Sequence, residues 1–116
     1  MKQFDHERLD VYSAAIDFVA LADGIVEQLP RGRGYLADQL QRAATSIALN
    51  IAEGAGEFSG PEKARFYRMA KRSATECAAV LDVAGRLELT APDRLATGRH
   101  LLLRIVSMLT KMVRRD

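Results

Sequence analysis

Helix-breaking residues interrupt this chain at only three places, and four long segments lie between them. The breaks are residues 30–34 (PRGRG), 54–61 (GAGEFSGP) and 90–93 (TAPD). Proline cannot continue a helix, and glycine favours loops and helix ends. The segments between the breaks carry apolar residues at helical spacing, and no run alternates as a half-buried strand would. The chain therefore predicts helices over residues 6–29, 35–55, 60–88 and 91–115.

The residues at the breaks predict how the helices begin. Ser59 and Glu62 have the spacing of a capping box, and Thr90 offers a hydroxyl cap just before Pro92. Each helix has on the order of 20 residues, or about 30 Å of length. Short loops between long helices favour an all-α, antiparallel up-down-up-down four-helix bundle, with residues 1–116 as one domain.

Composition narrows the class of protein and its compartment. Apolar residues make up 48% of the chain and charged residues 28%, which is typical of a globular domain. The one cysteine, Cys77, cannot form an internal disulfide, which fits a reducing compartment. No secretory signal and no apolar run of roughly 18 residues is found. We therefore expect a cytoplasmic protein that does not span a membrane.

The first predicted helix is apolar over an unusually wide arc, about 240° against the roughly 100° that one core face needs. One apolar stripe contains Leu9, Tyr12, Ile16, Val19 and Val26. A helix in a four-helix bundle is exposed on its outer side, so the economical explanation is that a second stripe packs on another subunit. A bundle distorted around a central first helix is the alternative. The second stripe, the predicted subunit interface, contains Val11, Ala14, Phe18, Leu21 and Ile25.

A stripe of hydrogen-bonding side chains borders the apolar face of the second predicted helix. Its spacings of three and four residues keep it on one side of a helix. Two residues of the third helix lie where they can join it. The structural interpretation is a polar seam that sets helix register, and the functional one is a ligand or catalytic site. The seam comprises Gln39, Arg42, Ser46, Asn50 and Glu53, with Ser73 and Glu76 from the third helix.

Positive charge gathers in the second half of the chain. Residues 1–60 hold five Lys/Arg and nine Asp/Glu, whereas residues 61–116 hold twelve and six. Such asymmetry suggests an anionic partner, or attraction between the two halves. A basic surface without aromatic residues for base stacking would bind phosphates without reading sequence. The predicted nucleic-acid contacts are Arg65, Arg68, Lys71 and Arg72 on the third helix, with Arg31 and Arg33 in the first loop.

The sequence carries no recognisable catalytic or metal-binding motif. Di-metal sites in helical bundles use Glu-x-x-His motifs, and this chain has none. His6 and His100 are isolated, and Cys77 falls on a core face, where a thiol is usually inert. We therefore expect no enzymatic activity, metal or cofactor.

The segment from residue 35 to residue 54 (YLADQLQRAATSIALNIAEG) resembles the signature of a bacterial family. Its pattern is close to L-x-x-Q-x-x-R-A-A-x-S-I-x-x-N-I-A-E-G, and the chain matches each fixed position. These are the four-helix bundle proteins first noticed in intervening sequences of 23S ribosomal RNA genes. The resemblance spans residues 4 to about 85, and the polar seam residues match polar positions of the family.

The resemblance implies a homopentamer of antiparallel four-helix bundles. It also implies similarity to accessory proteins of diversity-generating retroelements, which bind a reverse transcriptase and nucleic acid. Three functions follow as hypotheses: an oligomeric adaptor that contacts RNA or an RNA-bound protein, a scaffold that binds protein only, and a small-molecule-binding bundle that uses the polar seam.

Overall fold

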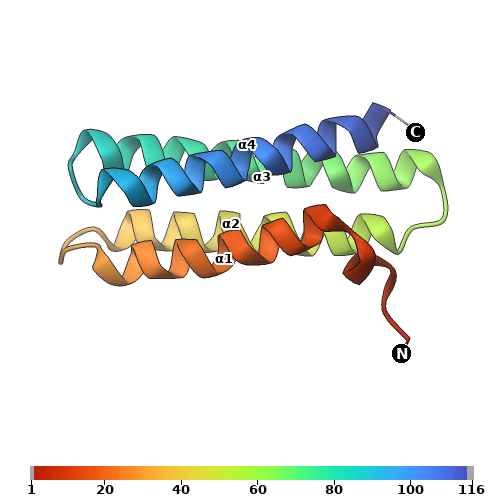
Figure 1. The fold of residues 1–116 in the computed structure, drawn as a ribbon, viewed down its shortest axis with the longest axis horizontal. Helices are drawn as coiled ribbons and strands as arrows, with labels where there is room; N and C mark the ends of the chain where they lie inside the picture. The colour runs from red at the N-terminus through yellow and green to blue at the C-terminus, as the bar shows by residue number, and fades with distance from the viewer. Residues whose placement is uncertain (1, 115–116) are drawn as a thin grey trace.

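Residues 2–114 form four antiparallel α-helices, preceded by one short 3-10 helix (Figure 1). The structure is a computed structural model and describes residues 2–114. Within that range the residues form helices and connecting loops, without a strand. The elements are η1 (Asp5–Arg8), α1 (Asp10–Gln28), α2 (Gly34–Ala55), α3 (Gly60–Arg86) and α4 (Pro92–Arg114).

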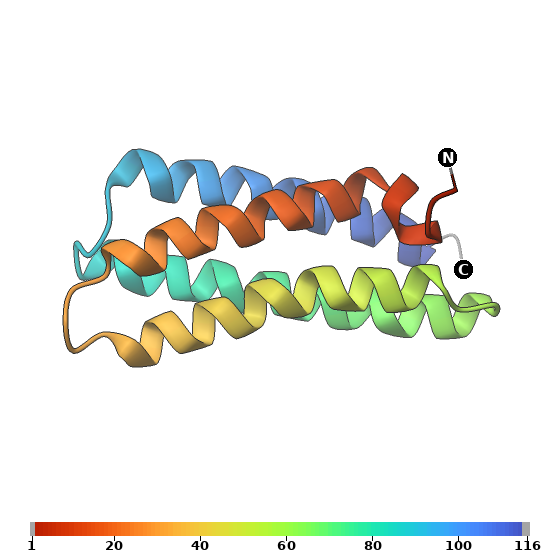
Figure 2. The same cartoon turned by 90° about the horizontal axis from the view of Figure 1, so that it is seen from below.

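The helices occupy the four corners of a bundle, so each packs against two neighbours. Helix α1 packs on α2 and α4, and α3 packs on the same two helices from the opposite corner. Figures 1 and 2 show two layers, with α1 and α2 in one and α3 and α4 in the other. The α1–α2 and α3–α4 loops lie at one end, while the α2–α3 loop and both termini lie at the other. The all-α four-helix bundle predicted from the sequence is confirmed.

The first helix begins later than its apolar spacing predicted. Leu9 adopts extended backbone (φ −88°, ψ 127°), which separates η1 from α1. The chain turns here so that the His6 ring contacts the Tyr12 ring edge-on, with centroids 4.6 Å apart. The N-terminal segment therefore lies against the end of the bundle and does not extend α1.

The core is built from the buried faces of all four helices. Large side chains such as Phe18, Ile47 and Ile105 are fully buried, and alanines lie between them. Small residues let the helix axes approach closely. At Gly98 of α4 the approach is tight, because a Cβ there would lie 3.0 Å from Leu81 Cδ1.

The predicted subunit interface on the first helix is wrong. Val11, Ala14, Phe18 and Ile25 are each at most 2% exposed within one chain, and Leu21 is half-buried against the same core. This stripe faces the core between the helices, so it is already buried without a partner subunit. The other apolar stripe is the more exposed one: its Ile16 is 44% exposed. Periodicity shows that two stripes exist but cannot show which one faces inward.

The helix ends follow part of the predicted capping chemistry. Ser59 Oγ accepts a hydrogen bond from the Glu62 backbone N–H (3.2 Å), which satisfies one N-terminal donor of α3. Thr90 does not cap α4. Its Oγ1 is buried and has no hydrogen-bond partner among residues 2–114, while the carbonyl of Ala91 accepts the first helical bonds of α4.

Helix α3 ends two residues earlier than predicted, at Arg86. Glu88 follows with φ 55°, in the left-handed region, and the Leu89 N–H donates back to the Ala84 carbonyl (2.9 Å). This geometry closes the helix as a left-handed cap does. Within residues 2–114, no helix is long and apolar enough to span a lipid bilayer.

Candidate nucleic-acid interface and polar groove

The polar seam contains one connected hydrogen-bond network between α2 and α3. Asn50 is one turn after Ser46, so its Nδ2 reaches both the Ser46 carbonyl (2.9 Å) and Ser46 Oγ (3.0 Å). Ser73 of α3 donates from Oγ to Ser46 Oγ (2.9 Å). Ser46 therefore joins the two helices at half-buried positions, and three of the seven predicted residues come together directly.

The other four seam residues do not enter this network. Gln39, Arg42, Glu53 and Glu76 are exposed, and in the part of the chain described, none of their side chains makes a hydrogen bond to the three-residue network. Sequence spacing placed five of the seven on one stripe of the second helix, with Ser73 and Glu76 of the third helix where they could join it. It could not separate positions that point between the helices from positions that point to solvent.

An open groove follows the network along the outer side of α2 and α3. Its volume is about 580 Å³, and Ser46, Asn50 and Ser73 line it together with Met69, Arg72 and Glu76. A second hollow of about 430 Å³ lies beside it along α2, where Arg42 and Leu49 contribute to the wall. Leu49 is 61% exposed and Met69 is 39% exposed. The groove and the hollow beside it thus combine hydrogen-bonding side chains with accessible apolar ones.

The Ser46–Asn50–Ser73 network can offer hydrogen bonds to a bound molecule, but it does not contain an activated nucleophile. Activating a serine hydroxyl as a nucleophile takes a general base within hydrogen-bond reach. The hydroxyls of Ser46 and Ser73 bond to each other and to an amide, and among residues 2–114 they bond to no histidine or carboxylate. Cys77 is fully buried. Desolvation raises the pKa of its thiol to about 12, and the charge of Glu76 adds to the rise. The thiol is therefore protonated at neutral pH.

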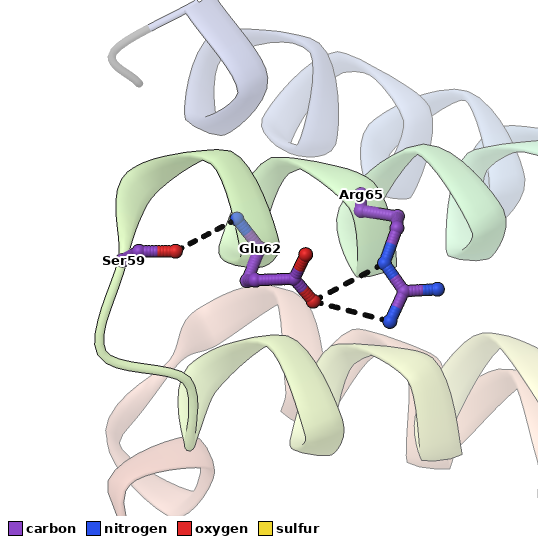
Figure 3. A network of polar contacts seen from close by, with 3 residues as sticks. All are labelled: Ser59, Glu62 and Arg65. Atoms are coloured by element: carbon purple, nitrogen blue, oxygen red, sulfur yellow. Dashed lines mark hydrogen bonds and ion pairs between the residues drawn. The ribbon is translucent and has the colours of Figure 1, made fainter.

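The basic residues of α3 differ in how much of their charge is available. Arg65 donates from Nε and Nη2 to Glu62 Oε2 (3.2 and 3.1 Å), as Figure 3 shows, and lies over the Phe66 ring. The Glu62 carboxylate faces Arg65 and not the Ser59 N–H, so only half of the predicted capping box forms. Arg68 and Arg72 are exposed, and neither forms an ion pair with a residue in the described range.

The structure separates the predicted nucleic-acid contacts into two groups. Arg31 and Arg33 lie in the α1–α2 loop, at one end of the bundle. Arg65 and Arg68 lie in the first turns of α3, near the opposite end. Arg33 Nη1 also donates to the Tyr35 hydroxyl (2.9 Å). The loop arginines and the α3 arginines therefore do not form one patch.

Helix α4 adds basic residues that the sequence reading did not assign to the interface. It holds five Lys/Arg and one Asp/Glu, and α3 holds six and three. Because α3 and α4 form one layer, this layer, called here the basic layer, carries a net charge of +7. The α4 members exposed on it are Arg99, Arg104, Lys111 and Arg114.

The opposite layer is acidic. Helix α1 holds four Asp/Glu and no Lys/Arg, while α2 holds two acids and one arginine, so this acidic layer carries a net charge of −5. The charge asymmetry between the two halves of the sequence is thus an asymmetry between two faces of one molecule. The up-down-up-down order produces it, because consecutive helices form each layer (Figures 1 and 2).

Together, these features define a small helical bundle whose distinctive chemistry lies on open surfaces: a polar groove on α2 and α3 and a basic layer on α3 and α4. The family model described as "23S rRNA-intervening sequence protein" matches residues 7–111. The chain belongs to this family. The match also covers most of α4, up to residue 111, which the sequence motif alone did not reach.

Comparison with solved structures supports the same fold. A protein of unknown function from the S23 ribosomal protein family of Bacteroides thetaiotaomicron superposes with a TM-score of 0.82 at 19% sequence identity. The alignment covers 89% of this chain and 97% of that one. No curated protein matches the chain.

Proposed function

We propose that this protein is a non-enzymatic, cytoplasmic, oligomeric accessory protein. Its basic layer contacts either the phosphate backbone of an RNA or a protein that is itself bound to RNA. The observation that carries the proposal is the +7 charge of α3 and α4, opposite a layer of −5. A one-sided field of this kind attracts a polyanion to one face. Contacts of Lys and Arg with phosphates supply affinity without sequence reading.

The end of the basic layer beside the α2–α3 loop is the strongest part of this surface. Arg68 extends from the part of α3 nearer that loop, and Arg72 lies near the middle of the helix. Because α4 runs antiparallel to α3, Lys111 and Arg114 come from the end that the loop shares. All four side chains are exposed. The oligomeric state is proposed from the family resemblance, which implies a homopentamer. Repetition of the basic end in an oligomer would multiply its charge.

The test is retention of a labelled single-stranded RNA by the purified protein at low salt. Arg68→Glu with Arg72→Glu should reduce affinity at least tenfold and flatten its dependence on salt, because each lost phosphate contact lowers the slope. The matched control is Arg31→Glu with Arg33→Glu, which makes the same change in charge at the other end and should have a smaller effect. Equal retention by wild type and the Arg68/Arg72 variant would refute the RNA contact.

A protein-only scaffold is the second candidate. The exposed Met69 in the polar groove and the exposed Leu49 in the hollow beside it favour this candidate. Apolar side chains beside fixed hydrogen-bonding groups are typical of protein interfaces. This candidate predicts a partner that stays bound after nuclease treatment and is lost in Leu49→Glu. Loss of every interaction on nuclease treatment would argue against it and for the RNA contact.

A further inference from the structure

The loop between α2 and α3 carries a phenylalanine whose ring has no partner. Phe58 is 102% exposed, so its whole side chain is in contact with solvent. The other phenylalanines differ: Phe18 is buried, Phe66 lies under an arginine guanidinium, and Phe4 stacks on a histidine ring. Among residues 2–114, the Phe58 ring contacts no other ring and no cationic side chain, so both of its faces are accessible.

The loop is held from both sides, so it presents this ring at a fixed place. Residues 56–59 join the two helices, and the Gly56 N–H donates back to two carbonyls of α2 (3.2 and 3.3 Å). Ser59 caps α3, and Lys63 Nζ donates to the Ala55 carbonyl at the end of α2 (3.0 Å). An aromatic ring on a loop that is already ordered pays little ordering cost when it binds.

Basic residues gather beside the loop on α3 and α4. Residues 60–69 hold three Lys/Arg and one Asp/Glu. Residues 105–114, from the antiparallel end of α4, hold two and none, so the two segments carry a net charge of +4. Arg68, Lys111 and Arg114 are exposed, and none forms an ion pair with a residue in the described range. Their charge is therefore available to phosphates.

The acidic residues at the end of α2 lie on the other side of the loop. Glu53 and Glu57 line a hollow of about 230 Å³ together with His6 of η1, and η1 packs on α1 and α2. A polyanion is repelled from that side and attracted to the ends of α3 and α4. A single exposed apolar side chain is ordinary on a protein surface, but a ring beside free cations has the composition of a single-strand binding site.

We propose that Phe58 stacks on an unpaired base of the RNA whose phosphates the basic layer contacts, so that the protein binds single-stranded RNA in preference to duplex. This inference rests on the proposed function and specifies its substrate. Every base has a flat face, so stacking adds affinity without reading sequence. In a duplex the bases already stack and pair with one another, which leaves no base face for the ring.

The sequence analysis found no aromatic residues to accompany the arginines of the third helix. It missed Phe58 because this residue lies in a loop, outside the helical spacing of those arginines. The fold brings the loop to the end of the bundle where α3 begins and α4 ends (Figure 1).

The experiment compares two probes: a single-stranded RNA of about 12 nucleotides, within the size that one small domain covers, and the duplex that it forms with its complement. Phe58→Ala should weaken binding of the single strand roughly 5- to 150-fold, the range expected for loss of one stacked base, and leave binding of the duplex unchanged. Phe58→Tyr keeps a ring and should bind as wild type does. The matched control is Phe4→Ala, which removes the other exposed phenylalanine (74% exposed) and should change neither affinity.

A fluorescence measurement reports the stacking directly. The chain has no tryptophan, so Phe58→Trp introduces a single reporter. Its emission should be quenched by the single strand and not by the duplex, because a stacked base quenches an indole. Phe4→Trp is the control and should keep its emission with both probes.

Two results overturn the stacking: no loss of affinity in Phe58→Ala, or an equal loss for the single strand and the duplex. It is also overturned if RNA does not quench Phe58→Trp while vesicles of phosphatidylserine and phosphatidylcholine shift its emission to shorter wavelength, which assigns the loop to a membrane contact. The phosphate contact is judged separately by Arg68→Glu with Arg72→Glu. If that variant loses RNA and Phe58→Ala does not, the stacking alone is refuted, whereas a wild type that retains neither probe overturns both.

Discussion

Gly54 of α2 packs directly against the ring of Tyr67 on α3: a Cβ at position 54 would lie 2.6 Å from Cε1 and 2.9 Å from Cδ1 of that ring. Both residues are buried. The closest approach of α2 and α3 therefore depends on the missing side chain. This close contact also explains why α2 has a glycine at position 54, although glycine within a helix costs about 1 kcal/mol relative to alanine.

Gly54→Ala should lower the free energy of unfolding. Overpacking a filled core costs about 1–3 kcal/mol, and we expect this cost to outweigh the better helix propensity of alanine. Gly56→Ala is the matched control. Its Cβ would lie 3.7 Å from the nearest atoms, at ordinary contact distance. Urea denaturation measures both variants. A Gly54→Ala protein as stable as Gly56→Ala would contradict the packing argument.

The Ser46–Ser73 hydrogen bond should contribute to stability as a pair. Ser46→Ala and Ser73→Ala should each cost about 1 kcal/mol, and a double-mutant cycle should give a coupling of about 0.5–1.5 kcal/mol. The control combines Ser46→Ala with Ser107→Ala on the exposed side of α4, which should be additive. A coupling near zero for Ser46 and Ser73 would mean that the bond contributes nothing measurable.

Glu88→Gly should stabilise the protein by about 1 kcal/mol. The backbone of Glu88 has φ 55°, which is strained for a residue with a Cβ and unstrained for glycine. Glu88→Ala removes the same charge without relieving the strain, so its unfolding free energy should stay near that of wild type. Chemical denaturation separates the two variants, and equal stabilities would show that strain at this position is negligible.

Stability should fall at alkaline pH because of Cys77. Burial raises the pKa of its thiol from 9.0 to about 12, so the folded state holds a proton that the unfolded state releases above pH 9. The free energy of unfolding should therefore drop between pH 9 and 12, by up to about 1.4 kcal/mol per pH unit. Cys77→Ala should lack this component. Parallel pH profiles for wild type and Cys77→Ala would contradict it.

Sequence reasoning recovered most of the fold because its signals are local. Proline and glycine mark the three breaks, and the Ser59 cap forms as predicted. The predicted helix caps were wrong where the same side chain or helix end could form either of two local hydrogen-bonding arrangements. Ser59 and Glu62 match a capping box, yet Glu62 turns to Arg65, and Thr90 matches a cap that Ala91 replaces.

The spacing of apolar residues and helix breakers by itself determined that this chain has four long helices, and the α2 motif identified its family. Only the tertiary structure decided which side of each helix is inside. Phe18 and Ile16 are equally apolar, but packing buries the first and leaves the second 44% exposed. The same packing joins α3 to α4 and so turns a charge bias along the chain into a basic face. Neither fact is local, because each depends on which helices become neighbours.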